Sequence, residues 1–207
     1  MNKWKESELV RSLLGFFLLF LLFVGLFIFI VPSTHQSSKI AEKIKSIKNE
    51  NVTYVAIGDS LTQGVGDSSN QGGFVPVLSQ ALESDFDWQV TSRNYGIAGN
   101  TSNQILKRMQ EKKDIQRDLK KAKVMTLTVG GNDVIHVIKD NITNLNVATF
   151  TKPAQAYQKR LRQIIELARK ENKTLPIYIV GIYNPFYLNF PEMTEMQTIV
   201  DNWNQST

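Results

Sequence analysis

Along most of the chain, apolar and polar residues follow two kinds of pattern, one typical of strands and one typical of helices. Short runs rich in β-branched and aromatic residues predict four strands, over residues 52–57, 89–95, 124–129 and 177–182. Apolar residues at intervals of three and four predict helices over residues 74–82, 101–109, 114–122, 153–172 and from 192 onward. Strands that alternate with helices favour a parallel sheet covered on both faces. The pattern therefore predicts an α/β domain over residues 52–207.

The first 51 residues follow a different pattern. Leu13 to Val31 carries no charged residue, and nineteen helical residues extend about 28 Å, close to the hydrocarbon thickness of a bilayer. This run predicts a transmembrane anchor at residues 13–31, after a flank at 1–12 and before a linker at 32–51. A cleaved signal peptide is the alternative, but its apolar core is shorter and Val31-Pro32-Ser33 is a poor cleavage site. Lysines flank both ends of the run, so charge does not fix its orientation; we expect the folded domain to be extracytoplasmic.

Composition removes several classes of function. The chain has no cysteine, which excludes disulfides, thiol catalysis and cysteine-based zinc sites. Its formal net charge is +5, and the basic residues gather at 39–48 and 107–123 without the interleaved aromatic residues of a nucleic-acid-binding face. We therefore expect no nucleic-acid partner.

Three junctions between a strand and the next helix carry small and polar residues, at positions 58–60, 96–100 and 130–133. The carboxyl ends of parallel strands meet at one edge of the sheet, where open α/β proteins bind ligands. Ser60 can expose its hydroxyl there as a nucleophile. Its own N–H, the N–H of Gly99 and the side-chain amide of Asn132 can donate to a developing oxyanion. This set of groups points to acyl transfer.

The same three segments resemble the sequence blocks of the GDSL, or SGNH, esterase and lipase superfamily. Residues 57–62 resemble its first block, 94–102 its second and 129–133 its third, and the likeness covers roughly residues 52–205. The resemblance implies a flavodoxin-like three-layer αβα sandwich of the SGNH-hydrolase type. It also implies that Ser60 is the nucleophile, that Ser60, Gly99 and Asn132 form the oxyanion hole, and that no metal or organic cofactor takes part.

One part of that family's site is missing from these 207 residues. The family's catalytic histidine and its supporting aspartate lie in a carboxyl-terminal Asp-x-x-His block, whereas Asp201 is followed by Asn-Trp-Asn. Of the two histidines, His35 lies beside the predicted membrane span and His136 on the helix after Asn132. We expect Asp133 to orient its turn rather than to act as a triad acid. The simplest interpretation is a chain that is truncated and inactive as it stands; natural loss of catalysis is the alternative.

These patterns favour a membrane-anchored ester hydrolase that acts on a lipid or an acylated glycan through an acyl-enzyme. A non-catalytic, membrane-anchored protein that binds a lipid or glycan in the same crevice is the rival hypothesis. A nucleotide-binding fold is disfavoured, because Gly64-Val65-Gly66 lacks the third glycine of G-x-G-x-x-G. The aromatic residues that could line an acyl site, or equally the core, are Phe74, Phe186, Tyr187 and Phe190.

Overall fold

The structure is a computed structural model that describes residues 50–141, 143, 146–184 and 194–205. The predicted membrane anchor, most of the predicted linker, and the aromatic residues Phe186, Tyr187 and Phe190 lie outside these residues. Among the helices that are described, none is both long enough and apolar enough to cross a bilayer. Residues 50–207 form a single folded unit, and the architecture below is that of this unit.

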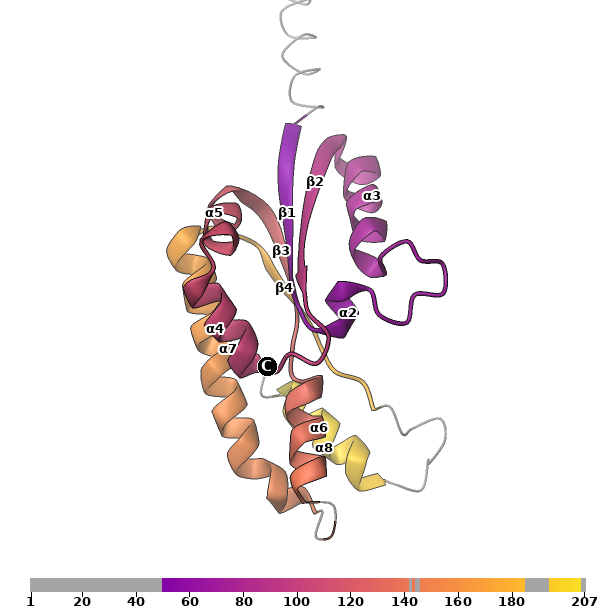
Figure 1. Ribbon diagram of the computed structural model, residues 1–207, viewed down its shortest axis with the longest axis vertical. Coiled ribbons are helices and arrows are strands. Elements are labelled where there is room, and N and C mark those ends of the chain that lie inside the picture. The colour runs from indigo at the N-terminus through magenta and orange to yellow at the C-terminus, as the bar shows by residue number, and fades with distance from the viewer. Residues whose placement is uncertain (1–49, 142, 144–145, 185–193, 206–207) are drawn as a thin grey trace, which may run out of the picture. The chain divides into compact units, whose positions relative to one another are not determined.

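Four parallel strands form the centre of the unit (Figure 1). They are β1 (Glu50–Gly58), β2 (Trp88–Gly96), β3 (Ala122–Thr128) and β4 (Ile177–Val180), in the order β2-β1-β3-β4. All four predicted strands are confirmed, with ends within two residues of the predicted ones. Gly58 pairs with Gly96, and Ile57 with Leu127, so β1, β2 and β3 end close to one level. The three turns that carry the predicted chemistry therefore start from one edge of the sheet.

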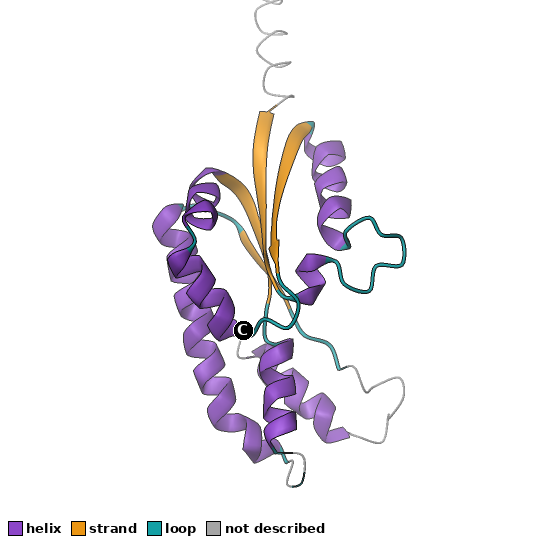
Figure 2. Ribbon diagram, in the orientation of Figure 1, coloured by secondary structure: helices purple, strands orange, loops and turns teal. Residues whose placement is uncertain are grey.

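Helices connect the strands and flank the sheet on both sides (Figure 2). In chain order they are α2 (Ser60–Gln63), α3 (Phe74–Phe86), α4 (Ser102–Glu111), α5 (Lys113–Lys121), α6 (Gly131–Asp140), the 3-10 turn η1 (Val147–Phe150), α7 (Thr151–Glu171) and α8 (Thr194–Gln205). The five helices predicted from periodicity are confirmed. The one expected over 114–122 ends at Lys121, because Ala122 already pairs with Thr53 in the sheet. The elements α2 and η1 are too short to show a hydrophobic period.

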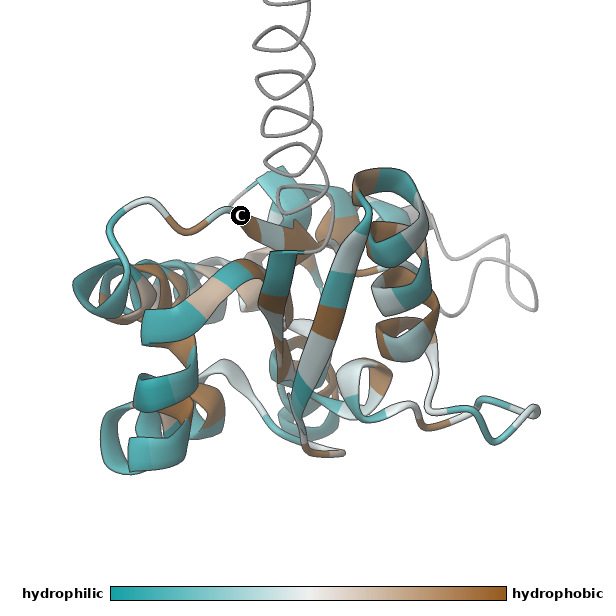
Figure 3. Cartoon of the chain, turned by 90° about the horizontal axis from the view of Figure 1, so that it is seen from above, coloured by the Kyte–Doolittle hydropathy of each residue, from teal (hydrophilic) through white to brown (hydrophobic). Residues whose placement is uncertain are grey.

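Side chains of β1 alternate between two hydrophobic clusters, one on each face of the sheet. Tyr54 and Ala56 pack beneath α3 in the smaller cluster. Val55 and Ile57 belong to the larger cluster, which includes residues of α4, α5, α7 and α8. Seen from above, hydrophobic residues gather on the strands and on the inner sides of the helices (Figure 3). The predicted α/β sandwich of the SGNH-hydrolase type is therefore confirmed.

Two helices extend the unit past the carboxyl ends of the strands, α6 directly after β3 and α8 at the end of the described chain (Figure 1). Trp203 of α8 packs against Tyr157 of α7, with ring centroids 5.0 Å apart. Asn204 accepts a hydrogen bond from the N–H of Ile182 at 3.0 Å and donates to its carbonyl oxygen at 2.8 Å. These contacts fix α8 against both α7 and the segment that follows β4.

Candidate active site

Ser60 is the first residue of α2, and one residue, Asp59, separates it from β1. Asp59 caps this short helix, because its carboxylate accepts a hydrogen bond from the N–H of Leu61 at 3.1 Å. The hydroxyl of Thr128, at the end of β3, donates to the same carboxylate at 2.8 Å. The hydroxyl of Thr62 lies 2.8 Å from that of Thr128. The turn that presents Ser60 is thus held in place by the neighbouring strand.

The second turn, residues 96–100, is tied to α2. The N–H of Ala98 donates to the side chain of Gln63 at 2.6 Å, and the side chain of Asn94 donates to the carbonyl oxygen of Thr62 at 2.7 Å. Gly99 has a φ of +79°, in the left-handed region that favours glycine. A Cβ added there would meet nothing within 4 Å. The positive φ is therefore what favours glycine at this position, and the space beside it is open.

A half-buried arginine joins the first two turns from the side of the larger core. Arg108 of α4 donates to the carbonyl oxygens of Gly58 at 3.1 Å and Tyr95 at 2.9 Å, at the ends of β1 and β2. Burial lowers the pKa of Arg108, but its ordinary value is so high that the guanidinium stays charged. This role could not be predicted from sequence, because an arginine on the flank of an amphipathic helix resembles a solvated one.

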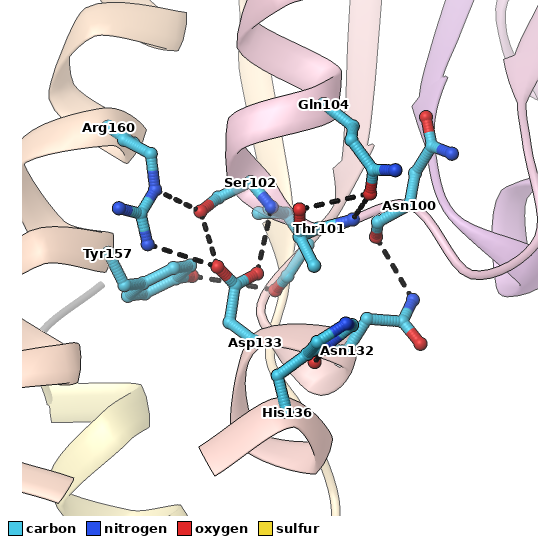
Figure 4. Close-up of polar contacts among 10 residues, drawn as sticks. Asn100, Thr101, Ser102, Gln104, Asn132, Asp133, His136, Tyr157 and Arg160 are labelled. Atoms are coloured by element: carbon cyan, nitrogen blue, oxygen red, sulfur yellow. Dashed lines mark hydrogen bonds and ion pairs between the residues drawn. The ribbon is translucent and has the colours of Figure 1, made fainter. Parts of the chain in front are cut away.

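The third turn presents Asn132, the second residue of α6. Its side-chain amide donates to the carbonyl oxygen of Asn100 at 3.0 Å (Figure 4). This bond uses one of the two amide hydrogens and orients the other. Gly130, just before, has a φ of +111°, and a Cβ there would lie 3.0 Å from Nε1 of Trp203 and 3.1 Å from the hydroxyl of Tyr157. Glycine therefore lets α7 and α8 pack directly behind this turn.

Asp133 joins the third turn to the start of α4. Its carboxylate is buried and accepts from the N–H of Ser102 at 2.8 Å and from the Ser102 hydroxyl at 2.6 Å (Figure 4). The side chain of Asp133 is not among those that line the cavity described next. These contacts agree with the orienting role that we expected for this residue.

A cavity of about 290 Å³ lies at the carboxyl edge of the sheet, and Ser60 and Asn132 both line it. Its walls come mainly from α6, the segment after β4, and α8. The apolar side chains that line it are Leu61, Val129, Val134, Ile135, Ile138, Val180, Ile182, Met196 and Val200. Gly99 and Phe74 are not lining residues, and Phe74 packs against the smaller cluster instead. The sequence did not reveal these walls, because helical periodicity does not distinguish a side chain that faces a cavity from one that faces the core.

No histidine lines this cavity within the described part of the chain. His136 is exposed, and its Nδ1 lies 2.7 Å from the carbonyl oxygen of Asn132 in its own helix. The titratable side chains in the cavity lining are those of Asp59 and Tyr183. In the same described ranges, no three His, Asp or Glu side chains are grouped so that they could hold a metal ion.

Known proteins resemble this chain in sequence and in fold. It is 33% identical over 174 residues to the uncharacterized protein YpmR of Bacillus subtilis, a match that covers 83% of this chain and 68% of that protein. It is 29% identical over 137 residues to the spore germination lipase LipC of Bacillus licheniformis, covering 64% of each. The matches thus span about two thirds of the length of these relatives.

The fold is also similar to that of the lipase Lip_vut3 from a goat rumen metagenome, with a TM-score of 0.68 and 26% identity. That similarity covers 75% of this chain and 73% of the lipase. The profile of the GDSL-like Lipase/Acylhydrolase family matches residues 56–207, which include all three turns. The chain therefore belongs to the GDSL-like lipase and acylhydrolase family.

Proposed function

We propose that this protein is a carboxylic ester hydrolase in which Ser60 is the nucleophile. In this proposal the N–H groups of Ser60 and Gly99 and the side-chain amide of Asn132 form the oxyanion hole. The observation that carries it is that Ser60 and Asn132 line one apolar cavity at the carboxyl ends of the parallel strands. Membership of a lipase and acylhydrolase family supports the same reaction class.

The reaction begins when the hydroxyl oxygen of Ser60 attacks the carbonyl carbon of the ester while a base takes the hydroxyl proton. The former carbonyl oxygen becomes an oxyanion and accepts hydrogen bonds from the three donors. The bond to the alcohol oxygen then breaks, the alcohol leaves with a proton, and the acyl group remains on Ser60. Water then attacks the same carbonyl carbon while the base takes one of its protons. The bond to the oxygen of Ser60 breaks, Ser60 regains a proton, and the carboxylic acid leaves. Asp59 orients the turn throughout, because Thr128 and Leu61 engage its carboxylate.

The cavity also bears on the substrate. Its volume of about 290 Å³ is at the small end for a ligand site, for which roughly 300–1,000 Å³ is usual. We infer that it holds an aliphatic acyl group of short to medium length, carried by a lipid or an acylated glycan. Each buried methylene contributes about 0.8 kcal/mol, so kcat/KM should rise about fourfold per methylene until the cavity is full.

The test is a series of p-nitrophenyl esters from acetate to dodecanoate, assayed with the protein and with Ser60→Ala. Imidazole is added in a parallel set, because no histidine is among the described lining residues and a base in solution can take the hydroxyl proton instead. We expect hydrolysis that depends on Ser60 in the set with imidazole and little hydrolysis without it, whereas the exposed control Ser84→Ala keeps the wild-type rate in both sets. Equal rates for the protein and Ser60→Ala, with or without imidazole, would refute the proposal and favour the non-catalytic binding protein.

His136 is tested in the same assay. Its ring faces a carbonyl oxygen of its own helix and does not line the cavity, so His136→Ala should leave the rate unchanged. If His136→Ala removed activity as completely as Ser60→Ala, His136 would be the base and our account of the site would be wrong.

We also propose that residues 13–31 anchor the protein in a membrane, with the hydrolase domain outside the cytoplasm. The uncharged apolar run supports this, since its length matches the bilayer core. Fractionation of cells that express the protein, beside a variant that lacks residues 13–31, tests the anchor. A protein that stays in the soluble fraction would contradict the anchor. Protease treatment of intact cells tests on which side the domain lies, and a domain that the protease does not reach would contradict the extracytoplasmic location.

A further inference from the structure

We propose that Arg160 is a positioning residue for the oxyanion hole, which fixes the side-chain amide of Asn132 by holding α4 and α6 at their observed spacing. The inference rests on the proposed function. It adds a residue of α7 that lies outside the three sequence segments with predicted chemistry. Arg160 touches neither the cavity nor the three donors, so its effect on catalysis is indirect.

Arg160 reaches from α7 into the junction between the second and third turns (Figure 4). Its Nε donates to the hydroxyl of Ser102 at 2.7 Å, and a terminal nitrogen donates to the carboxylate of Asp133 at 3.2 Å. The hydroxyl of Ser102 in turn donates to the same carboxylate at 2.6 Å. The three side chains, from α7, α4 and α6, thus form a closed ring of hydrogen bonds.

Burial makes this ring specific for arginine. The side chain of Asp133 is 6% exposed, that of Arg160 is 26% exposed, and Ser102 is fully buried. A buried carboxylate requires partners that are charged or donate hydrogen bonds. The planar guanidinium places two donors at a fixed separation, which here match one oxygen of Ser102 and one of Asp133. The single ammonium of a lysine has no such fork.

The ring can fix the position of Asn132 because two of its members lie close in sequence to Asn132 and to its hydrogen-bond partner Asn100. Asn132 directly precedes Asp133 at the start of α6, and Asn100 lies two residues before Ser102 at the start of α4. The bond between Asn132 and Asn100 therefore crosses the same gap as the bonds between Asp133 and Ser102. A shift of α4 against α6 would lengthen the Asn132 bond and let the amide rotate away from the oxyanion.

The first test compares Arg160→Lys and Arg160→Met with the control Arg162→Lys, at an exposed position of the same helix. Misplacement of about 1 Å can cost about a hundredfold in rate, so we expect kcat for a p-nitrophenyl ester to fall about ten- to a hundredfold in both Arg160 variants. KM should stay within about twofold, because ground-state binding to the apolar walls is unchanged. Arg160→Lys keeps the charge, and its melting temperature shows whether it folds like the wild type. A folded Arg160→Lys with normal kcat, or with an effect only on KM, would overturn the proposal.

The second test does not depend on turnover. In the ¹H–¹⁵N spectrum of the full chain in detergent micelles, the side-chain amide signals of Asn132 are assigned by their loss in Asn132→Ala. The chemical shifts of these signals should change in Arg160→Lys and stay the same in Arg162→Lys. If the protein hydrolyses no ester, the proposed function fails but this spectrum still decides whether Arg160 positions Asn132. Asn132 signals that stay in place in Arg160→Lys would refute the positioning role.

Discussion

Asp59 and Thr128 form two hydrogen bonds with each other across the carboxyl ends of β1 and β3. The hydroxyl of Thr128 donates to the carboxylate of Asp59 at 2.8 Å and accepts from its N–H at 3.2 Å. Both residues are buried, at 5% and 1% exposure. The position of the proposed nucleophile, one residue after Asp59, is therefore set by the adjacent strand as well as by its own helix.

Thr128→Val should destabilise the protein by about 2–3 kcal/mol, because it removes the hydroxyl that serves Asp59 and leaves a buried carboxylate with fewer donors. The side chain of valine has nearly the same shape as that of threonine, so packing is little changed. Urea unfolding of this variant, beside Thr91→Val at an exposed position of β2, measures the effect. A loss no larger than that of Thr91→Val would show that the two bonds contribute little.

Asn132→Ala should lower kcat by about 10²–10³, the usual effect of removing one oxyanion donor. The melting temperature should fall only slightly, since the amide makes one hydrogen bond at the start of a helix. Steady-state kinetics with a p-nitrophenyl ester measures the loss, with Asn103→Ala at an exposed position of α4 as control. An increase in KM at unchanged kcat would mean that Asn132 binds substrate without stabilising the transition state.

Gly96→Ala should act mainly on stability, and Gly99→Ala mainly on activity. A Cβ at Gly96 would lie 2.1 Å from the backbone nitrogen of Gln63, so this change should cost at least about 3 kcal/mol. A Cβ at Gly99 would meet no protein atom, and its positive φ should cost only about 1–2 kcal/mol. The Gly99 variant should nevertheless lose more activity than its lost stability explains, because its methyl group projects beside a proposed donor. Unfolding and kinetic measurements on both variants separate the loss of stability from the loss of activity. A fully active Gly99→Ala would show that Gly99 is not part of the oxyanion hole.

A carboxylate organises the loop between α2 and α3. Asp67 accepts hydrogen bonds from the Ser69 hydroxyl at 2.5 Å and from the N–H groups of Ser69, Gln71 and Gly73 at 2.9, 2.8 and 3.0 Å. The bond from the Ser69 hydroxyl, followed by those from the backbone, holds the pKa of Asp67 well below its usual range. In the unfolded chain the pKa of this group returns to about 3.9.

The stability that Asp67 contributes should therefore depend on pH with a definite sign. Because the folded pKa is the lower one, the contribution is complete above the unfolded pKa and is lost as pH falls toward the folded pKa. The melting temperature of Asp67→Asn should lie below that of the wild type at pH 7, and the difference should narrow below about pH 4. Asp85→Asn, at an exposed position of α3, is the control. A difference that is constant from pH 7 to pH 3 would show that charge has no part in the loop's stability.

The strands and the three turns were accessible from sequence because their signals are local. β1 and β3 are mostly buried on both faces and are rich in apolar and β-branched residues. Ser60, Gly99 and Asn132 each follow a predicted strand within a few residues. A parallel sheet then brings such turns to one edge, whatever the order of the strands. The strand order itself, β2-β1-β3-β4, was not predicted, because no single segment encodes its neighbours.

Arg108 and Arg160 were beyond sequence reasoning for a related reason. The partners of Arg108 include the carbonyl oxygen of Gly58, 50 positions away, and Arg160 pairs with Asp133, 27 positions away. On an amphipathic helix, an arginine beside the apolar face looks the same whether it meets water or a buried acceptor. The cavity walls from α6 and α8 were hidden in the same way, since only tertiary packing separates a lining residue from a core residue.

The cavity draws its lining residues from nearly the whole folded unit, from Asp59 to Val200. During translation, Ser60 is therefore synthesised long before other residues around it. Thr128 follows Asp59 by 69 positions, and α8 is the last element that the structure describes. Folding of strands that pair across such separations is slow, because the chain loses the entropy of loop closure before the stabilising contacts form. On refolding from urea, helical circular dichroism should return first and Ser60-dependent hydrolysis last. A nascent chain that ends before α8 lacks Met196 and Val200, and therefore cannot form the cavity described above.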